Sequence, residues 1–204
     1  VAVVLLISLT WMLADGRRVI GQIGNQNLPV LELNQTVNGE LSAGTTQGYL
    51  VKIEAGTYVL FEAIFKQDAA QMALYGSNGE LFYRQFRDAR RVPTGLWQRL
   101  GRVIENAGTY RLELSAKAEQ KTPSSYSLKI AELRPATEDD RAFEMAERWQ
   151  QEAGKLWGEK KNFDQAIALG EKALAIFQKL SPQTGDPGNM AILLGNLYHD
   201  RGYH

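Results

Sequence analysis

Few side chains in this sequence could carry out acid–base, nucleophilic or metal chemistry. The chain contains no cysteine and only two histidines, His199 and His204. They lie five residues apart, whereas two metal ligands on one helical face need a spacing of three or four. Asp139 and Asp140 are interpreted as charges at the start of a helix rather than as an acid–base pair. The sequence therefore predicts no catalytic residue, no metal site and no cofactor in residues 1–204.

Charge and composition exclude further classes of partner. Lys+Arg and Asp+Glu both number 23, so the formal net charge is zero, and the overall charge gives no indication of nucleic-acid binding. The stretch 44–48 contains glycines but lacks the lysine of a phosphate-binding loop. The hydrophobic fraction, 44%, is typical of a globular protein, and the length allows one large domain or two small ones.

Residues 1–28 are predicted to be a signal peptide or the remnant of a membrane anchor, followed by a linker. The segment 1–14 carries no charge and precedes Arg17 and Arg18. Such a segment suits an export signal but is too short to span a bilayer alone; a buried strand or helix is the alternative. We expect a bacterial protein that is exported (periplasmic or extracellular) or membrane-anchored, with membrane contact only through this segment.

The elements that would position any binding residue begin with short strands in residues 29–134. Apolar residues alternate with polar ones, the pattern of half-buried strands, and the segment 58–65 is apolar on both faces, which predicts a central strand. The alternating apolar residues are Tyr49, Val51 and Ile53; Tyr110, Leu112 and Leu114; and Tyr126, Leu128 and Ile130. Asn38-Gly39 and Asn78-Gly79 predict hairpin turns. About eight short strands at this spacing favour an antiparallel β-sandwich of jelly-roll type.

These motifs resemble the bacterial pre-peptidase C-terminal (PPC) family. The best marks are Ala55-Gly56-Thr57-Tyr58 and Ala107-Gly108-Thr109-Tyr110, supported by Gly39-Glu40-Leu41, Gly48-Tyr49 and Tyr126-Ser127-Leu128. The resemblance covers about 29–133 and implies a small β-sandwich of the kind attached to secreted enzymes. The arginine-rich stretch 84–102 has no counterpart in that pattern.

The stretch 84–102 predicts a basic patch on the sandwich. It contains Arg84, Arg87, Arg90, Arg91, Arg99 and Arg102 against a single acid, Asp88. Such a patch could attract anionic lipid, polysaccharide or an acidic protein surface; alternatively, the charges protect strand edges from pairing. Trp97, between Leu96 and Leu100, is either a core residue or a platform for a sugar ring. A fully buried Trp97 would exclude a carbohydrate-binding module.

Residues 135–204 are predicted to be helical. Thr137 and Asp140 have the spacing of a capping box. Apolar residues at steps of three and four mark two amphipathic helices: Ala142, Ala146, Trp149, Ala153 and Leu156, then Phe163, Ala166, Ile167, Gly170, Ala173, Leu174, Phe177 and Leu180. Asn162 separates them, and Asp186-Pro187 predicts the start of a third helix. Almost no linker precedes them, so we expect the helices to be docked on the sandwich.

A repeat period of 41 residues links the first and third of these helices. Gly154 and Trp157 recur as Gly195 and Tyr198, and a fixed period in this range is typical of stacked helical arrays. With Ala166 and Ala173, these positions resemble the tetratricopeptide repeat (TPR). Ala153 and Gly170 depart from that pattern, and the usual period is shorter. The glycines predict close helix crossings, because a mid-helix glycine otherwise costs about 1 kcal/mol.

The TPR resemblance implies a concave face that binds peptides or neighbouring domains. The matching positions are Arg148, Gln151, Lys155, Asn189, Asn196 and His199. The chain ends within the second repeat, so we expect a truncated array of about one and a half repeats. The order of units, with Ala136-Thr137-Glu138-Asp139-Asp140-Arg141 at the junction, resembles bacterial proteins with TPRs and a C-terminal caspase-like CHAT domain. That resemblance implies a downstream peptidase as a further alternative.

The predicted architecture is α+β in two domains, a PPC-like β-sandwich (29–134) followed by TPR-like helices (135–204). The predicted function is a non-catalytic, exported or membrane-anchored scaffold whose partners are proteins, peptides or its own downstream domain. The alternatives are a carbohydrate- or surface-binding sandwich and the regulatory front end of a larger peptidase.

Overall fold

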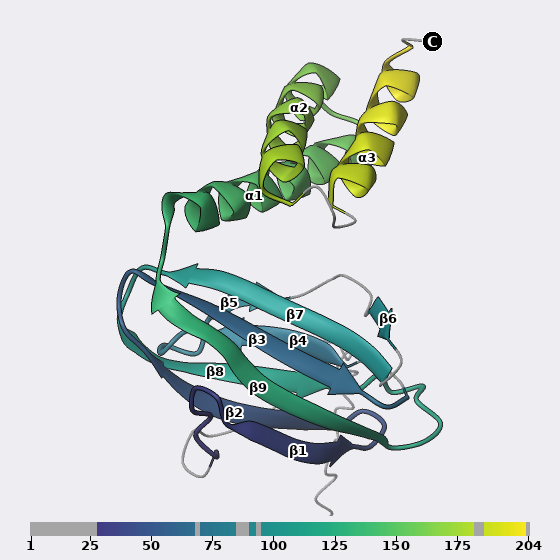
Figure 1. Cartoon of the computed structure of the whole chain (residues 1–204). Coiled ribbons are helices and arrows are strands. Elements are labelled where there is room, and N and C mark those ends of the chain that lie inside the picture. Colours follow the sequence, from purple (N-terminus) through teal and green to yellow (C-terminus); the bar gives the residue numbers. More distant parts are fainter. Residues whose placement is uncertain (1–27, 68–69, 85–89, 93–94, 182–185, 203–204) are drawn as a thin grey trace, which may run out of the picture.

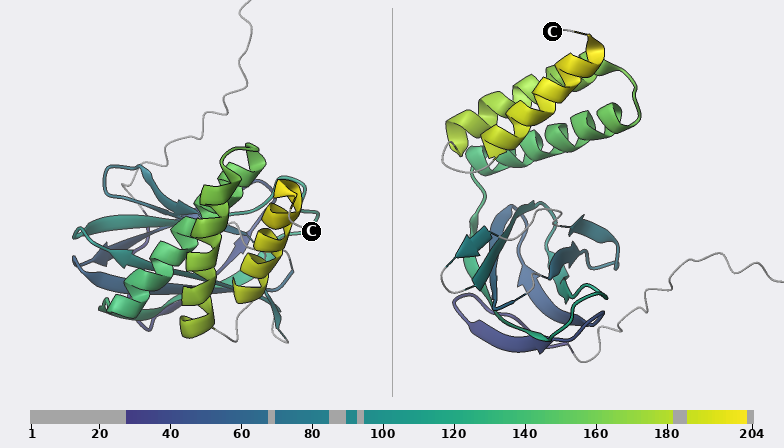
Figure 2. Two further views of the ribbon diagram at one scale, coloured as in Figure 1. Left: turned by 90° about the horizontal axis from the view of Figure 1, so that it is seen from above. Right: turned by 90° about the vertical axis from the view of Figure 1, so that its right-hand side faces the viewer.

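The computed structural model describes residues 28–67, 70–84, 90–92, 95–181 and 186–202. Within them the chain forms nine strands and then three helices (Figure 1). The strands are β1 (Thr36–Leu41), β2 (Thr46–Ile53), β3 (Thr57–Phe65), β4 (Gln71–Tyr75), β5 (Leu81–Arg84), β6 (Arg90–Val92), β7 (Gly95–Ile104), β8 (Gly108–Ser115) and β9 (Ser124–Pro135). The helices are α1 (Glu138–Gly158), α2 (Phe163–Leu180) and α3 (Asp186–Arg201). The helices lie together on one side of the sandwich, next to β7 (Figures 1 and 2).

The strands form two antiparallel sheets packed as a sandwich. One sheet has five strands in the order β1-β9-β3-β7-β6, and the other has four in the order β2-β8-β4-β5. β2 and β3 belong to different sheets, as do β7 and β8, so the short turns between them carry the chain across the core. The predicted antiparallel β-sandwich is therefore confirmed, and so is the α+β class, with helices following strands.

Strand alternation buries one face of each sheet. All nine apolar residues predicted to face inward from β2, β8 and β9 are buried in a single core. They are joined from β3 by Val59, Phe61, Ala63 and Phe65, each fully buried. β3 lies between β9 and β7, and Leu60, on its outer face, is also buried. The prediction of a central strand at 58–65 is confirmed.

One predicted hairpin turn is wrong. Asn38 and Gly39 lie inside β1, opposite Ser127 and Tyr126 of β9. A Cβ on Gly39 would lie 2.5 Å from the hydroxyl of Tyr126, so the glycine makes room for the tyrosine rather than turning the chain. That hydroxyl is 2.5 Å from the hydroxyl of Tyr49 on the opposite sheet, and this hydrogen bond is buried.

The second predicted hairpin turn, at Asn78-Gly79, is confirmed. Asn78 and Gly79 lie in the connection between β4 and β5, and Gly79 has a φ of +80°, which glycine adopts without strain. Gly56, between β2 and β3, has a φ of +71°. The Asn78 side chain accepts a hydrogen bond from the backbone N–H of Glu80 at 3.1 Å, which stabilises the turn locally.

The helices have a core of their own. Both amphipathic stripes are confirmed: Ala146 and Ala153 of α1 and Ala166, Ala173 and Phe177 of α2 are fully buried. α3 adds Met190, Leu194 and Leu197. Asn162, in the left-handed conformation, separates α1 from α2 as predicted. These three helices match the predicted number, but three helices do not distinguish a tetratricopeptide array from another helical hairpin with a third helix.

The predicted N-terminal segment, 1–28, lies outside the described residues except for Leu28. In the part of the chain that is described, none of the helices combines the length and apolarity required to cross a bilayer. The sandwich ends at Pro135, which is in register with Thr57, and α1 begins three residues later.

Candidate interaction surface

The six residues predicted to form a binding face are all exposed. Arg148, Gln151 and Lys155 lie on α1, and Asn189, Asn196 and His199 lie on α3. On α1 the buried residues, Ala146 and Ala153, lie on the opposite side of the helix, and on α3 Met190 and Leu197 face the helical core. Helix packing therefore leaves the six polar side chains exposed to solvent.

The glycines of the 41-residue period are not at helix crossings. A Cβ added to Gly154 or Gly195 would meet no atom within 4 Å. Each glycine follows a buried residue, Ala153 or Leu194, and one residue turns about 100° around a helix. Both therefore point away from the core, and the prediction of close crossings at these positions is wrong.

The close approach occurs at Gly170 of α2 instead. A Cβ there would lie 2.8 Å from Leu194 Cδ2 and 2.9 Å from Met190 Cε, both on α3. Gly170, one of the two residues that depart from the repeat pattern, is thus the residue at which α3 comes close to α2. The signal available in the sequence was the position of Gly170 within the apolar stripe of α2.

Polar contacts hold the end of α3 against α1. Asp200 accepts hydrogen bonds from Trp157 Nε1 at 2.8 Å and from Lys160 Nζ at 2.6 Å. The hydrogen bond from the Lys160 ammonium, followed by that from the Trp157 indole, lowers the pKa of Asp200 to about 2. His199 Nδ1 lies 3.4 Å from the other Asp200 oxygen. Asp200 thereby connects the end of α3 to Trp157 of α1 and to Lys160, which follows α1.

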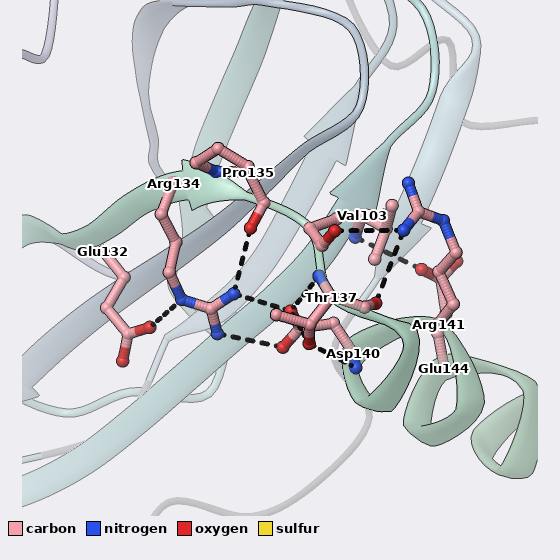
Figure 3. Close-up of polar contacts among 9 residues, drawn as sticks. Val103, Glu132, Arg134, Pro135, Thr137, Asp140, Arg141 and Glu144 are labelled. Atoms are coloured by element: carbon pink, nitrogen blue, oxygen red, sulfur yellow. Dashed lines mark hydrogen bonds and ion pairs between the residues drawn. The ribbon is translucent and has the colours of Figure 1, made fainter.

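The start of α1 is fixed by the sandwich. Thr137 and Asp140 form the predicted capping box, in which the backbone N–H of Asp140 donates to Thr137 Oγ1 and that of Thr137 donates to Asp140 Oδ2. Arg134 at the end of β9 donates to both Asp140 oxygens, at 2.6 and 2.9 Å (Figure 3). This two-pronged hydrogen bond from Arg134 is the main reason that the pKa of Asp140 falls to about 2. The interpretation of Asp140 as a helix-end charge is confirmed.

A second set of contacts joins α1 to β7. Arg102 Nη1 donates to Glu147 Oε2 at 2.6 Å, and only 6% and 12% of these two side chains are exposed. The backbone N–H of Val103 donates to Glu144 Oε2 at 3.2 Å (Figure 3). A carboxylate from α1 therefore satisfies an N–H group of β7, the kind of group that an edge strand would otherwise offer to another chain. The helices are docked on the sandwich, as expected.

Glu144 also connects this junction to the exposed face of α1. Its second oxygen, Oε1, accepts a hydrogen bond from Arg148 Nη2 at 2.6 Å. Arg148 remains 74% exposed, so one carboxylate holds both the edge of β7 and one of the six surface residues. The sandwich thus helps to orient Arg148, a coupling that the sequence pattern did not indicate.

The described arginines of 84–102 lie on strands of both sheets. Arg84 lies in β5 and Arg90 and Arg91 in β6, which are edge strands of different sheets, so the edge-protection interpretation fits these three. Arg102 is buried against Glu147, and Arg99 is paired with Glu62 at 3.2 Å. Arg87 lies outside the described residues. Strand order therefore distributes the described arginines over both sheets, and burial removes Arg102 from the surface.

Trp97 is only partly buried, whereas full burial would have excluded carbohydrate binding. Its indole lies beneath the guanidinium of Arg99, whose Cζ is 5.1 Å from the ring centroid. As for other chemistry, the described residues contain no group of three or more His, Cys, Asp or Glu side chains that could hold a metal ion. His204 lies outside the described residues.

Comparisons with known proteins give structural likenesses only. No protein-family model matches the chain, and no curated protein matches it. The pre-peptidase C-terminal domain of a Bacillus anthracis collagenase is similar over 51% of this chain and 94% of that domain, with 13% identity and a TM-score of 0.38. The Aeromonas hydrophila PliG, a periplasmic inhibitor of g-type lysozyme, is similar over 50% of this chain and 96% of its own, with 12% identity and a TM-score of 0.33. Likeness at this level carries no conclusion about function.

Proposed function

We propose that this chain is a non-catalytic interaction scaffold, exported or membrane-anchored, which binds peptides or a neighbouring domain through the exposed face of α1 and α3. In this proposal the helices are the beginning of a tetratricopeptide-type array and the sandwich is a PPC-like module that carries it. The observation that supports it is the arrangement of α1 and α3, which both bury their apolar sides and present six polar residues outward.

The polar character of this face suits reversible peptide binding. Arg148 and Lys155 can pair with carboxylates, while Gln151 and Asn196 can both donate and accept hydrogen bonds with a peptide backbone. Arg148 is oriented by Glu144, which lowers the entropy lost when a ligand binds it. Because α1 is fixed to the sandwich, the exposed face of α1 and α3 would keep one orientation relative to the sandwich.

The test is selection of peptides from a random display library by the whole chain, followed by affinity measurement with the selected peptides. Replacing Arg148 and Lys155 by alanine is expected to weaken binding at least about tenfold, as for central interface residues. Lys179→Ala and Gln178→Ala, exposed on α2, are the matched controls and should leave affinity unchanged. Selected peptides that bind the controls and the α1 variant equally well would place the site elsewhere and refute the proposal.

A further inference from the structure

The outer face of the five-stranded sheet presents two rows of side chains that the proposed helical function does not use. Strand register places them side by side across the sheet. The first row runs from Trp97 through Ile64 and Ser127 to Asn38; the second runs from Arg99 through Glu62 and Lys129 to Thr36. In Figure 1 this face is turned toward the viewer, and no described helix or strand lies in front of it.

The first row combines an aromatic ring with small polar groups. Trp97 is partly buried, Ser127 is partly buried and Asn38 is exposed. An indole fixed on a strand offers a flat apolar surface at little entropic cost, while a hydroxyl and an amide can each donate and accept hydrogen bonds. A flat ring beside such groups suits a ligand that is apolar on one side and rich in hydroxyl groups at its rim, as a pyranose is.

The second row carries a surplus of positive charge. Glu62 lies between Arg99, at 3.2 Å, and Lys129, at 3.1 Å. The Glu62 side chain is 17% exposed, whereas those of Arg99 and Lys129 are 45% and 46% exposed. One carboxylate therefore faces two cations, and solvent reaches the cations more than the carboxylate. The uncompensated charge can attract an anionic group of a ligand.

The dimensions of this platform fit a short stretch of polymer. Neighbouring strands are about 4.8 Å apart, so Arg99, Glu62 and Lys129 span about 10 Å across three strands. Trp97 lies two residues from Arg99 on β7, a separation of about 7 Å along the strand. The guanidinium of Arg99 lies over the indole, with Cζ 5.1 Å from the ring centroid, so a sugar ring reaches the indole when this guanidinium moves aside to pair with a carboxylate of the polymer. The next sugar of the chain would lie toward Lys129.

We propose that this face, defined by Trp97, Arg99, Glu62, Lys129, Ser127 and Asn38, binds an acidic polysaccharide. In this proposal Trp97 stacks on a sugar ring, and Arg99 and Lys129 pair with carboxylates of the polymer. Glu62 competes with those carboxylates for the two cations and so sets the affinity. The site is separate from the face of α1 and α3 and does not depend on the proposed scaffold function.

The test measures binding of the whole chain to polygalacturonate, in which every sugar carries a carboxylate, and to its fully methyl-esterified form, in which the same backbone is neutral. The unmodified chain should bind the acid and lose binding with added salt. Trp97→Ala should weaken binding about tenfold or more, and Arg99→Gln or Lys129→Gln roughly two- to fivefold each. Lys179→Gln, which removes one exposed charge on α2, is the matched control and should have no effect.

Glu62→Gln gives the sharpest outcome. Removing the competing carboxylate should tighten binding roughly two- to fivefold. If Glu62 served only to stabilise the sheet, its replacement would instead weaken binding. Trp97→Phe keeps an aromatic ring and decides the role of this position if Trp97→Ala does not fold. Absence of binding to the acid, equal binding to the ester, or weaker binding by Glu62→Gln would each overturn the proposal. Binding to phosphatidylglycerol vesicles without binding to the polymer would overturn it in favour of a membrane surface.

Discussion

Replacing Glu147 by alanine is expected to destabilise the protein by about 3 kcal/mol, because it removes one half of a buried ion pair. Arg102 and Glu147 meet at 2.6 Å between β7 and α1, with 6% and 12% of their side chains exposed. Removal of one partner from such a pair typically costs about 3–5 kcal/mol, because the remaining charge stays in a poorly solvated position. We take the lower value because the pair lies at the boundary of two units.

The expected loss of stability can be converted into a change in melting temperature. For a chain of this size, 1 kcal/mol corresponds to about 2–4 °C, so Glu147→Ala should lower the melting temperature by about 6–12 °C. Glu152→Ala removes the same group from an exposed position of α1 and should change stability by less than about 0.5 kcal/mol. The difference between these two glutamates isolates the contribution of burial at the junction.

The assay is urea unfolding of the unmodified chain, Glu147→Ala, Arg102→Met and the double variant, followed by circular dichroism. The double-mutant cycle should give a coupling energy of about 1–3 kcal/mol. Hydrogen exchange at the Val103 amide reports on docking of α1, because this amide donates to Glu144, and it should accelerate in Glu147→Ala. A coupling energy below about 0.5 kcal/mol, with unchanged exchange at Val103, would show that the pair does not hold the two units together.

Three further results are expected. Gly170→Ala should destabilise the helices by about 1–3 kcal/mol through overpacking, whereas Gly195→Ala, with open space around its Cβ, should stabilise them by up to about 1 kcal/mol; thermal unfolding distinguishes the two, and equal effects would contradict the packing described. Tyr126→Phe should cost about 1–2 kcal/mol in urea unfolding, because the buried hydroxyl of Tyr49 loses its partner, and a double Phe variant that is no more stable would contradict this reason. The pKa of Asp140 is lowered to about 2, so its contribution to stability is fully present above about pH 4 and is lost as the pH falls toward 2. In acid unfolding, the Asp140→Asn variant should not show this loss of stability between about pH 4 and 2. A pH profile identical to that of the unmodified chain would show that Asp140 makes no such contribution.

Much of the fold could be predicted because its signals are local. The alternation of Tyr110, Leu112 and Leu114 identifies a half-buried strand whatever its neighbours are. The capping box of Thr137 and Asp140 depends on residues only three apart, and the structure confirms it. The sequence also located both amphipathic helices, since a buried stripe requires only the regular period of the helix.

The errors have a common cause. Asn38-Gly39 has the composition of a hairpin turn, but its glycine is required by Tyr126, a residue on a strand far along the chain. Gly154 and Gly195 were expected at crossings, yet the crossing residue is Gly170, because the side of each helix that faces a neighbour depends on how the helices pack. The binding face itself was predicted from a family pattern, and the six residues stay a prediction that binding measurements must test.

The sequence by itself determined the strands, the helices, their caps and most of the buried residues, since these follow from short-range periodicity and from side chains that contact their own backbone. Only the tertiary structure decided which distant residues meet. It placed Arg102 against Glu147, let Glu144 hold both Val103 and Arg148, and aligned Trp97 with the row beside Arg99, Glu62 and Lys129. Such pairings depend on strand order and helix docking, which arise from the summed packing of both cores and leave no local pattern in the chain.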